Sequence, residues 1–149
     1  MENIFENKTT HNLIDRINNL SHDCIPIWGE MNVAQMLAHS SVMFDYVYNS
    51  HEKPNKLKQF LLRIFIKPMV VGKKPYKRLS RTAPEFLITD ERYFEIEKEK
   101  LIDYIKKTQQ LGVEYFEGKE SHSFGKLTAK EWSTTFYKHL DHHLTQFAV

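Results

Sequence analysis

Two histidines near the end of the sequence, His139 and His143, stand four positions apart in the segment YKHLDHHLTQF. On an α-helix, residues four apart share a face, with about 5–6 Å between their Cβ atoms. Both imidazoles could therefore bind one divalent metal ion, as in zinc motifs with this spacing. His142 lies to the side of His143 on such a helix and is the weaker candidate ligand. The alternative is a helix that carries polar histidines and no metal.

A third ligand has to come from another helix, and His39 is the candidate, in the segment AQMLAHSSVMF. Two interpretations of this residue are open. It is either a core histidine bonded to a backbone carbonyl or a third nitrogen ligand. Three nitrogens that leave coordination positions open for water or substrate are typical of catalytic rather than structural metal sites.

The helix that would carry the pair has the clearest start signal in the sequence. In LTAKEW, Thr128 is the expected cap and Glu131 completes a capping box, with Leu127 and Trp132 as a hydrophobic staple. A stripe at helical spacing follows and is expected to face the interior of the protein. It consists of Trp132, Phe136, His139, His143 and Phe147.

The helix that would carry His39 also has a capping box. Asn32 is the expected cap, Gln35 stands at the third helical position, and the helical rhythm continues to about Asn49. Both candidate ligand helices thus have sequence signals that fix where they begin.

Three further helices are expected from apolar periodicity, over Thr10–Leu20, Lys56–Lys67 and Asp90–Leu111. The second of these is strongly apolar, which suggests a core helix or a subunit interface more than a helix that lies on a membrane surface, and it should stop at Pro68. The third should end at Gly112, in a left-handed cap. Its inward face is expected to hold Phe94, Leu101, Ile105 and Thr108. The pattern predicts one all-α domain over residues 1–149, a bundle with antiparallel neighbours.

Composition narrows the class of protein. The 149 residues carry a net charge of +2, too small to suggest a nucleic-acid partner, and no stretch reaches the ~18 apolar residues of a membrane span. Cys24 is the only cysteine and the first residues do not resemble a signal peptide, so we expect a cytoplasmic protein with no membrane partner. The basic run Lys73–Arg81 is either a solvated loop or a patch that attracts an anionic ligand near a site mouth.

The segments MNVAQMLAHSS and HSFGKLTAKEW…YKHLDHHLTQF resemble an uncharacterised branch of the DinB/YfiT-like superfamily, and the resemblance spans nearly the whole chain. It implies an up-and-down four-helix bundle, often dimeric. It also implies a divalent metal bound by one histidine of the second helix and an HxxxH pair of the last. The matching positions here are His39, His139 and His143.

Two further positions match the resemblance. Gln146 corresponds to a glutamine commonly found just after the histidine pair, where it could orient a ligand or a bound water. HSFG, residues 122–125, corresponds to a loop that usually contains proline where this chain has Ser123. His122 is expected near the site mouth but not as a ligand.

The resemblance implies two kinds of metal-dependent enzyme, a hydrolase or a transferase that uses a low-molecular-weight thiol, each with a small-molecule substrate. Three imidazoles suit zinc, nickel, iron or copper, and ligand type does not choose among them. The rival hypothesis is a non-catalytic bundle with a structural or vestigial metal that works through a partner surface.

No general base is obvious in the sequence. Asp141 falls on another face of its helix from the histidine pair and is expected at the surface or between helices. Glu30 precedes the cap of the second helix and nothing places it at the site. Homodimerisation through the apolar segment Leu57–Ile66 is a further prediction.

Overall fold

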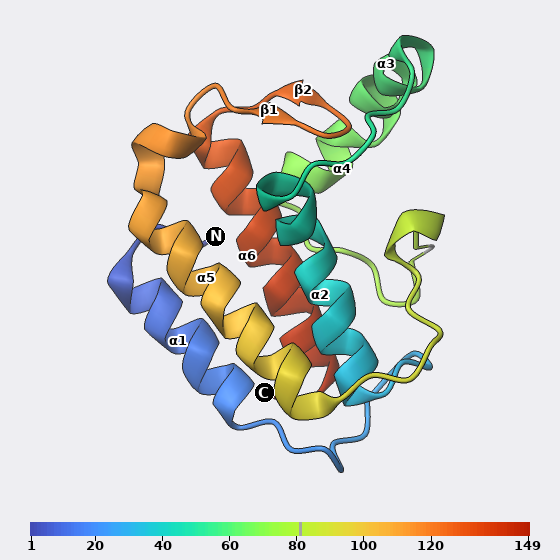
Figure 1. Cartoon of the computed structure of the whole chain (residues 1–149), viewed down its shortest axis with the longest axis vertical. Helices are drawn as coiled ribbons and strands as arrows, with labels where there is room; N and C mark the ends of the chain where they lie inside the picture. The colour runs from blue at the N-terminus through green and yellow to red at the C-terminus, as the bar shows by residue number, and fades with distance from the viewer. Residues whose placement is uncertain (81) are drawn as a thin grey trace.

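The computed structural model describes residues 1–80 and 82–149, and these are mostly helical, as predicted (Figure 1). The only sheet that they contain is a two-stranded antiparallel hairpin of β1 (Glu120–Ser121) and β2 (Gly125–Lys126), which was not predicted. None of the described helices is both long and apolar enough to cross a membrane. The helices are α1 (Asn7–Asn18), α2 (Val33–Tyr48), α3 (Lys56–Phe65), α4 (Lys67–Val71), α5 (Phe94–Phe116) and α6 (Ala129–Gln146).

Four of these helices, α1, α2, α5 and α6, surround one hydrophobic core (Figure 1). Helix α2 packs against α5 and α6, and α1 packs against the same two helices. The largest side chains that are fully buried come from all four helices. They include Leu13, Ile17, Met36, Leu37, Phe44, Leu101, Ile105, Phe116, Phe136 and Leu140.

Helices α2 and α5 run in the same direction, so the expectation of antiparallel neighbours is wrong for this pair. Asp45 of α2 accepts a hydrogen bond from Lys100, and Tyr48, three residues later, bonds Thr108 farther along α5. The cause is the connection over residues 72–93, which leads the chain back along the molecule before α5 begins (Figure 1). Bundles with such a long crossover place two consecutive long helices parallel.

The capping predictions for the two histidine-bearing helices are confirmed. Asn32 accepts a hydrogen bond from the backbone N–H of Gln35, whose side chain accepts one from the backbone of Asn32. Thr128 and Glu131 form the same reciprocal pair at the start of α6. These contacts satisfy N–H groups that the helix itself leaves unpaired, and they fix the residue at which each helix begins.

Helix α1 begins at Asn7, three residues before the predicted start at Thr10. Thr9 and Thr10 are buried, and the hydroxyl of Thr10 donates a hydrogen bond to the carbonyl of Ile4. Apolar periodicity missed this first turn because polar residues make its inward contacts.

Helix α3 lies mostly exposed at the surface, so the expectation of a core helix is wrong. None of its residues is buried, and the side chains of Leu57 and Phe65 are 70% and 71% exposed. Pro68 does not end the helical segment either. It lies in the first turn of α4, where a residue without an N–H group costs no hydrogen bond.

Helix α5 begins at Phe94 instead of Asp90 and continues beyond Gly112 to Phe116. Gly112 has a non-helical φ of 69° and ψ of −174°, so the long helical stretch ends at this glycine, as predicted, and a short second stretch continues α5 beyond the kink. Leu101, Ile105 and Thr108 are buried, as predicted, while Phe94 is only half-buried.

Candidate metal centre

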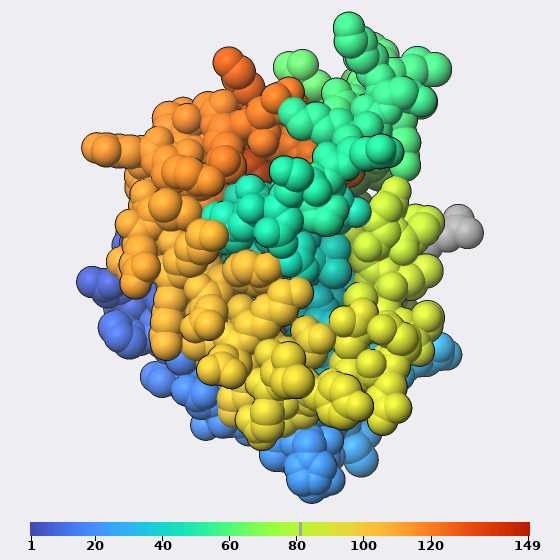
Figure 2. Space-filling model, viewed as in Figure 1, coloured from blue at the N-terminus to red at the C-terminus, as the bar shows by residue number. Residues whose placement is uncertain are grey.

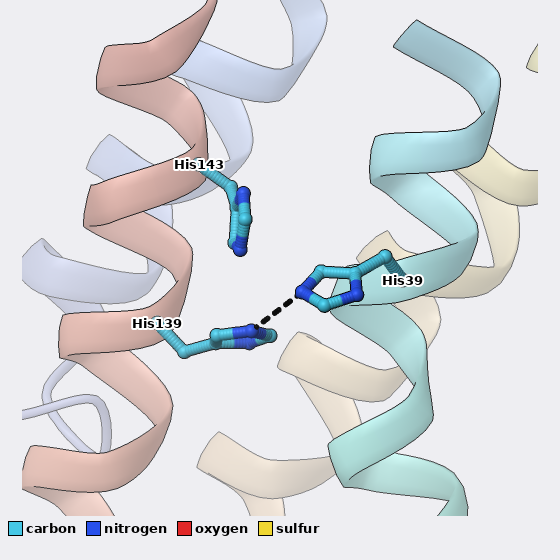
Figure 3. Close-up of side chains that lie close together, drawn as sticks. All are labelled: His39, His139 and His143. Atoms are coloured by element: carbon cyan, nitrogen blue, oxygen red, sulfur yellow. Dashed lines mark hydrogen bonds between the residues drawn. The ribbon is translucent and has the colours of Figure 1, made fainter. Parts of the chain in front are cut away.

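Three histidines from two helices meet in the interior of the protein (Figure 3). His39 comes from α2, and His139 and His143 come from successive turns of α6. One ring nitrogen of each lies within 4.8 Å of the others, and the Nε2 atoms of His39 and His139 are 3.0 Å apart. Two nitrogens that bind one tetrahedral zinc ion at their usual bond lengths are roughly 3.3 Å apart. The cluster therefore has the dimensions of a metal site.

The hydrogen bond of His39 leaves a lone pair at the centre of the cluster. Its Nδ1 atom is 2.8 Å from the carbonyl oxygen of Phe86. A carbonyl only accepts, so Nδ1 carries the proton of the neutral ring and Nε2 carries the lone pair. His39 therefore has features of both interpretations. Its Nδ1 atom bonds a backbone carbonyl, and its Nε2 atom faces the two histidines of α6.

Gln146 fixes the third ring in the same way. Its side-chain amide donates to the carbonyl of Trp28 at 2.6 Å, which turns Oε1 towards His143. That oxygen is 2.8 Å from Nδ1 of His143, so this nitrogen carries the proton and Nε2 keeps its lone pair. Gln146 thus occupies the orienting position that the resemblance implied.

Of the three histidines, His139 has the fewest hydrogen-bond partners for its ring nitrogens among the described residues. Its Nδ1 atom is buried and has no hydrogen-bond partner among the described residues. Its Nε2 atom faces the lone pair of His39 and can donate to it while no ion is present. Without an ion, this N–H is the one donor that the three rings can offer to the two lone pairs of His39 and His143, and a buried acceptor without a donor is costly. The donor set therefore fits a divalent ion better than a polar core.

Burial keeps all three rings neutral. Burial lowers the pKa of His39 and, with its neighbouring histidines, lowers the pKa of His139 well below the ordinary value. For His143, burial and the adjacent His39 lower the pKa to about 3. Imidazole binds metal only without its second proton, so these rings are ready to act as ligands at neutral pH.

Acidification is expected to destabilise the metal-free protein. The pKa of His143 falls from 6.5 in an unfolded chain to about 3 on folding, so between these values only the unfolded state takes up the proton. Stability is therefore complete above pH 6.5 and falls as the pH drops, by at most about 1.4 kcal/mol per pH unit for each such histidine.

Urea unfolding in the presence of a chelator, at several pH values between about 7.5 and 5, tests this linkage. Ordinary carboxylates stay mostly ionised over this range. The His143→Gln variant removes one titrating ring and should show a smaller loss of stability on acidification. Unfolding midpoints that do not depend on pH would contradict the burial of neutral imidazoles.

The connection between α1 and α2 holds Gln146 in place. Gly29 has a φ of 84°, and a Cβ atom there would lie 2.7 Å from the amide nitrogen of Gln146. The backbone N–H of Ile27 donates to the carbonyl of Gln146 at 2.8 Å. Glycine is thus required both by its backbone conformation and by the close approach of this side chain.

Replacing Gln146 with leucine is expected to weaken zinc binding by roughly 10–100-fold, the usual effect of losing a contact that orients a ligand histidine. The change removes the acceptor that holds His143 Nδ1. Competition with a chromophoric chelator measures the affinity. Thr145→Ala, at an exposed neighbouring position, is the matched control and should bind zinc like the wild type. Equal affinities for all three proteins would mean that Gln146 does not orient the ring.

A cavity of about 420 Å³ has His139 in its wall. This volume is in the range of pockets that bind small organic molecules. His122 lines the cavity, as expected for a residue near the site mouth, and it is not part of the three-histidine cluster. Most of the wall is apolar, and it includes Met43, Val47, Leu62, Ile66, Val70, Phe86, Phe124 and Leu127.

The basic run lies beside the histidine helix, and its described cations are exposed, as both of its interpretations predict. The ring of Tyr76 packs edge-on against His142, and the guanidinium of Arg78 lies 4.3 Å above the ring of Trp28. These side chains line a smaller hollow of about 180 Å³. Lys138 of α6 fixes the start of this segment by donating to the carbonyls of Met69 and Gly72. Arg81, the last cation of the run, lies outside the described residues.

The two carboxylates considered from the sequence do not belong to the site. Asp141 pairs with Arg16 of α1 at 2.8 Å, as expected for a residue between helices, and Glu30 is exposed. The cluster formed by the described residues contains no carboxylate. The roles of Phe86 and Trp28 were missed because both act through backbone carbonyls, which leave no signal in the sequence.

One of three comparisons with known proteins found a match. A family model described as "Protein of unknown function (DUF1569)" matches residues 5–149. No curated protein and no solved structure matches the chain. The matched region includes all three histidines, but the description of the family carries no chemistry.

Proposed function

Since the chain belongs to the DUF1569 family, whose function is unknown, its activity has to be argued from the site, and we propose that it is a divalent-metal-dependent enzyme. His39, His139 and His143 would hold the ion. The observation that carries the proposal is the convergence of three buried, neutral imidazoles beside a cavity large enough for a small molecule. Phe86 and Gln146 orient two of the rings.

A divalent ion bound there would act as a Lewis acid that lowers the pKa of a coordinated water or thiol towards neutrality. Zinc, nickel and iron are the candidate ions, and copper suits the same ligands. The chain itself supplies orientation through the hydrogen bonds to His39 and His143, and the apolar wall of the cavity excludes water from the bound substrate.

Two reaction classes remain, hydrolysis and transfer of a low-molecular-weight thiol, and one observation favours the second. Cellular thiols of this size carry carboxylates, and Arg78 lies over Trp28 in the hollow that His142 lines, on the helix that carries two of the three histidines. The cluster itself consists of histidines, and Glu85, a carboxylate that lines the adjoining cavity, is paired with Lys58.

We also propose that the four long helices form a four-helix bundle of the DinB/YfiT kind. Support comes from the placement of one histidine on α2, of two on α6, and of Gln146 against the second of these. The parallel course of α2 and α5 means that the bundle is not strictly up-and-down. A homodimer and a cytoplasmic location stay predictions.

The alternative, a non-catalytic bundle with a structural metal, has less support. Structural zinc sites are usually closed by four protein ligands, whereas this cluster offers three. A structural role predicts that loss of the ion lowers the melting temperature sharply.

Activity assays of the metal-loaded protein test the proposal. Protein without an affinity tag is loaded separately with zinc, nickel and iron(II). It is then offered apolar electrophiles with a series of small thiols, and apolar esters and amides with water. Turnover that depends on the ion and is absent from His139→Ala supports the enzyme, and the productive reaction names its class. Failure of the protein to retain any of the three ions would overturn it.

A further inference from the structure

Helix α3 projects from the rest of the molecule (Figures 1 and 2), and the residues that the structure describes leave one of its faces, which is apolar, exposed. Among the described elements it packs mainly against α4. Continuous apolar surface of this kind marks an interaction site, because single proteins seldom leave it open to water. The exposed apolar side chains of the segment are Leu57, Phe60, Leu61, Ile64, Phe65, Ile66 and Met69.

The two long sides of α3 have different surroundings. Lys58, Leu62 and Ile66 line the cavity next to the histidine cluster. At 100° per residue, Leu57, Phe60, Leu61, Ile64 and Phe65 fall on the opposite side, within an arc of roughly 140°. The outer apolar face is therefore not the wall of the cavity, and its exposure is not explained by substrate binding.

The segment that carries this face contains basic residues and no acidic ones. Ten of the 21 basic residues of the chain, and none of its 19 acidic ones, fall between Glu52 and Glu85. Three of these cations are paired with acids elsewhere, such as Lys67 with Glu131. Within the described part of the chain, no ion pair neutralises Lys56, Arg63 or Lys73.

We propose that the arm formed by α3 and α4 binds the surface of a lipid bilayer that contains anionic phospholipids. Amphipathic helices that lie at membrane surfaces combine Phe and Leu on one face with Lys and Arg at its edges. The apolar face of α3 would enter the interface, and Lys56 and Arg63 would contact the headgroups. Each cation close to such a surface adds about 1 kcal/mol of attraction.

A second copy of the chain fits this face less well. A two-fold dimer places the same surface of both subunits in contact, so two basic arms of like charge would meet. The homodimer predicted through Leu57–Ile66 is therefore the competing outcome, and the experiment has to distinguish the two.

Vesicle flotation with the full chain tests the proposal. We expect the protein to float with vesicles of phosphatidylcholine that contain roughly 30% phosphatidylglycerol, and not with phosphatidylcholine alone. Raising the salt from about 50 to about 300 mM should weaken the binding, because it screens exposed charges. Phe60→Ser/Phe65→Ser should reduce the bound fraction about tenfold, which corresponds to about 1.4 kcal/mol.

Ile25→Ser/Ile96→Ser is the matched control, because these side chains are 83% and 62% exposed but lie outside the arm. It should float like the wild type. No flotation with anionic vesicles, or equal flotation of both double variants, would overturn the proposal. A dimer in light scattering that Phe60→Ser/Phe65→Ser converts to a monomer would assign the face to a second copy. The wild type and both double variants should contain the same amount of metal. A failure of membrane binding would therefore not count against the proposed enzyme.

Discussion

His143→Ala is expected to lose its metal ion almost completely, with an affinity more than about 100-fold below that of the wild type. Loss of a contact that only orients a ligand already costs about 10–100-fold, and this change removes one of three ligands outright. The ring it removes is buried, neutral and held by Gln146 with its free nitrogen at the centre of the cluster. Metal content by mass spectrometry, together with chelator competition, measures the loss.

His142→Ala is the matched control for this experiment. It removes the adjacent histidine from the same helix, but that ring packs against Trp28 and Tyr76 and is not part of the cluster. It should retain the ion at close to one per chain. Equal retention by both variants would show that the three histidines do not form the site.

The same pair of variants separates a catalytic ion from a structural one. If the ion serves only chemistry, His143→Ala should melt close to the metal-free wild type, with little difference from the loaded protein. A large drop on losing the ion would favour the structural alternative.

Phe136→Ala is expected to lower the free energy of unfolding by about 3–5 kcal/mol, the usual cost of removing a buried phenylalanine ring. Phe136 is fully buried and stacks on Phe44, with ring centroids 4.6 Å apart and planes within 4° of parallel. It also contacts the rings of Phe116 and Trp132. Removing it leaves a cavity among rings that come from three different helices. The helices would have to move towards one another to fill that cavity, so most of its cost should remain.

Urea unfolding measures this effect, and Phe65→Ala is its control. The ring of Phe65 is 71% exposed, so its loss should change the stability by no more than about 0.5 kcal/mol. A loss below about 1 kcal/mol for Phe136→Ala would mean that the aromatic cluster can collapse around the missing ring. Phe136 lies one turn before His139, so weaker metal binding should accompany the loss of stability.

What the sequence predicted well depends on neighbours along the chain. The capping boxes at Asn32 and Thr128 need only residues three positions apart, and both helices begin where they were expected. The pairing of His139 with His143 follows from helix geometry alone. The addition of His39 came from its mid-helix position and from the family resemblance, and the structure places it against the pair.

What the sequence did not predict depends on distant parts of the chain. An apolar run such as Leu57–Ile66 looks the same whether its face is covered or open, so the exposure of α3 could not be foreseen. The hydrogen bonds that orient the histidines end on backbone carbonyls of Phe86 and Trp28, positions that any residue could supply. The direction of α5 relative to α2 is set by the connection between them.

The packing of the first two helices on the last two determines when the protein can fold during its synthesis. Helix α1 packs on α5 and α6, which are made much later, and the backbone N–H of Ile4 bonds Ser133, 129 positions farther along the chain. Helices α1 and α2 therefore leave the ribosome with their apolar faces exposed, and these faces stay exposed until α5 and α6 have been synthesised. Contacts at such sequence separation slow folding and prolong the exposure of partly formed chains. We expect the nascent chain to bind chaperones until α6 has emerged, and its core to close only then.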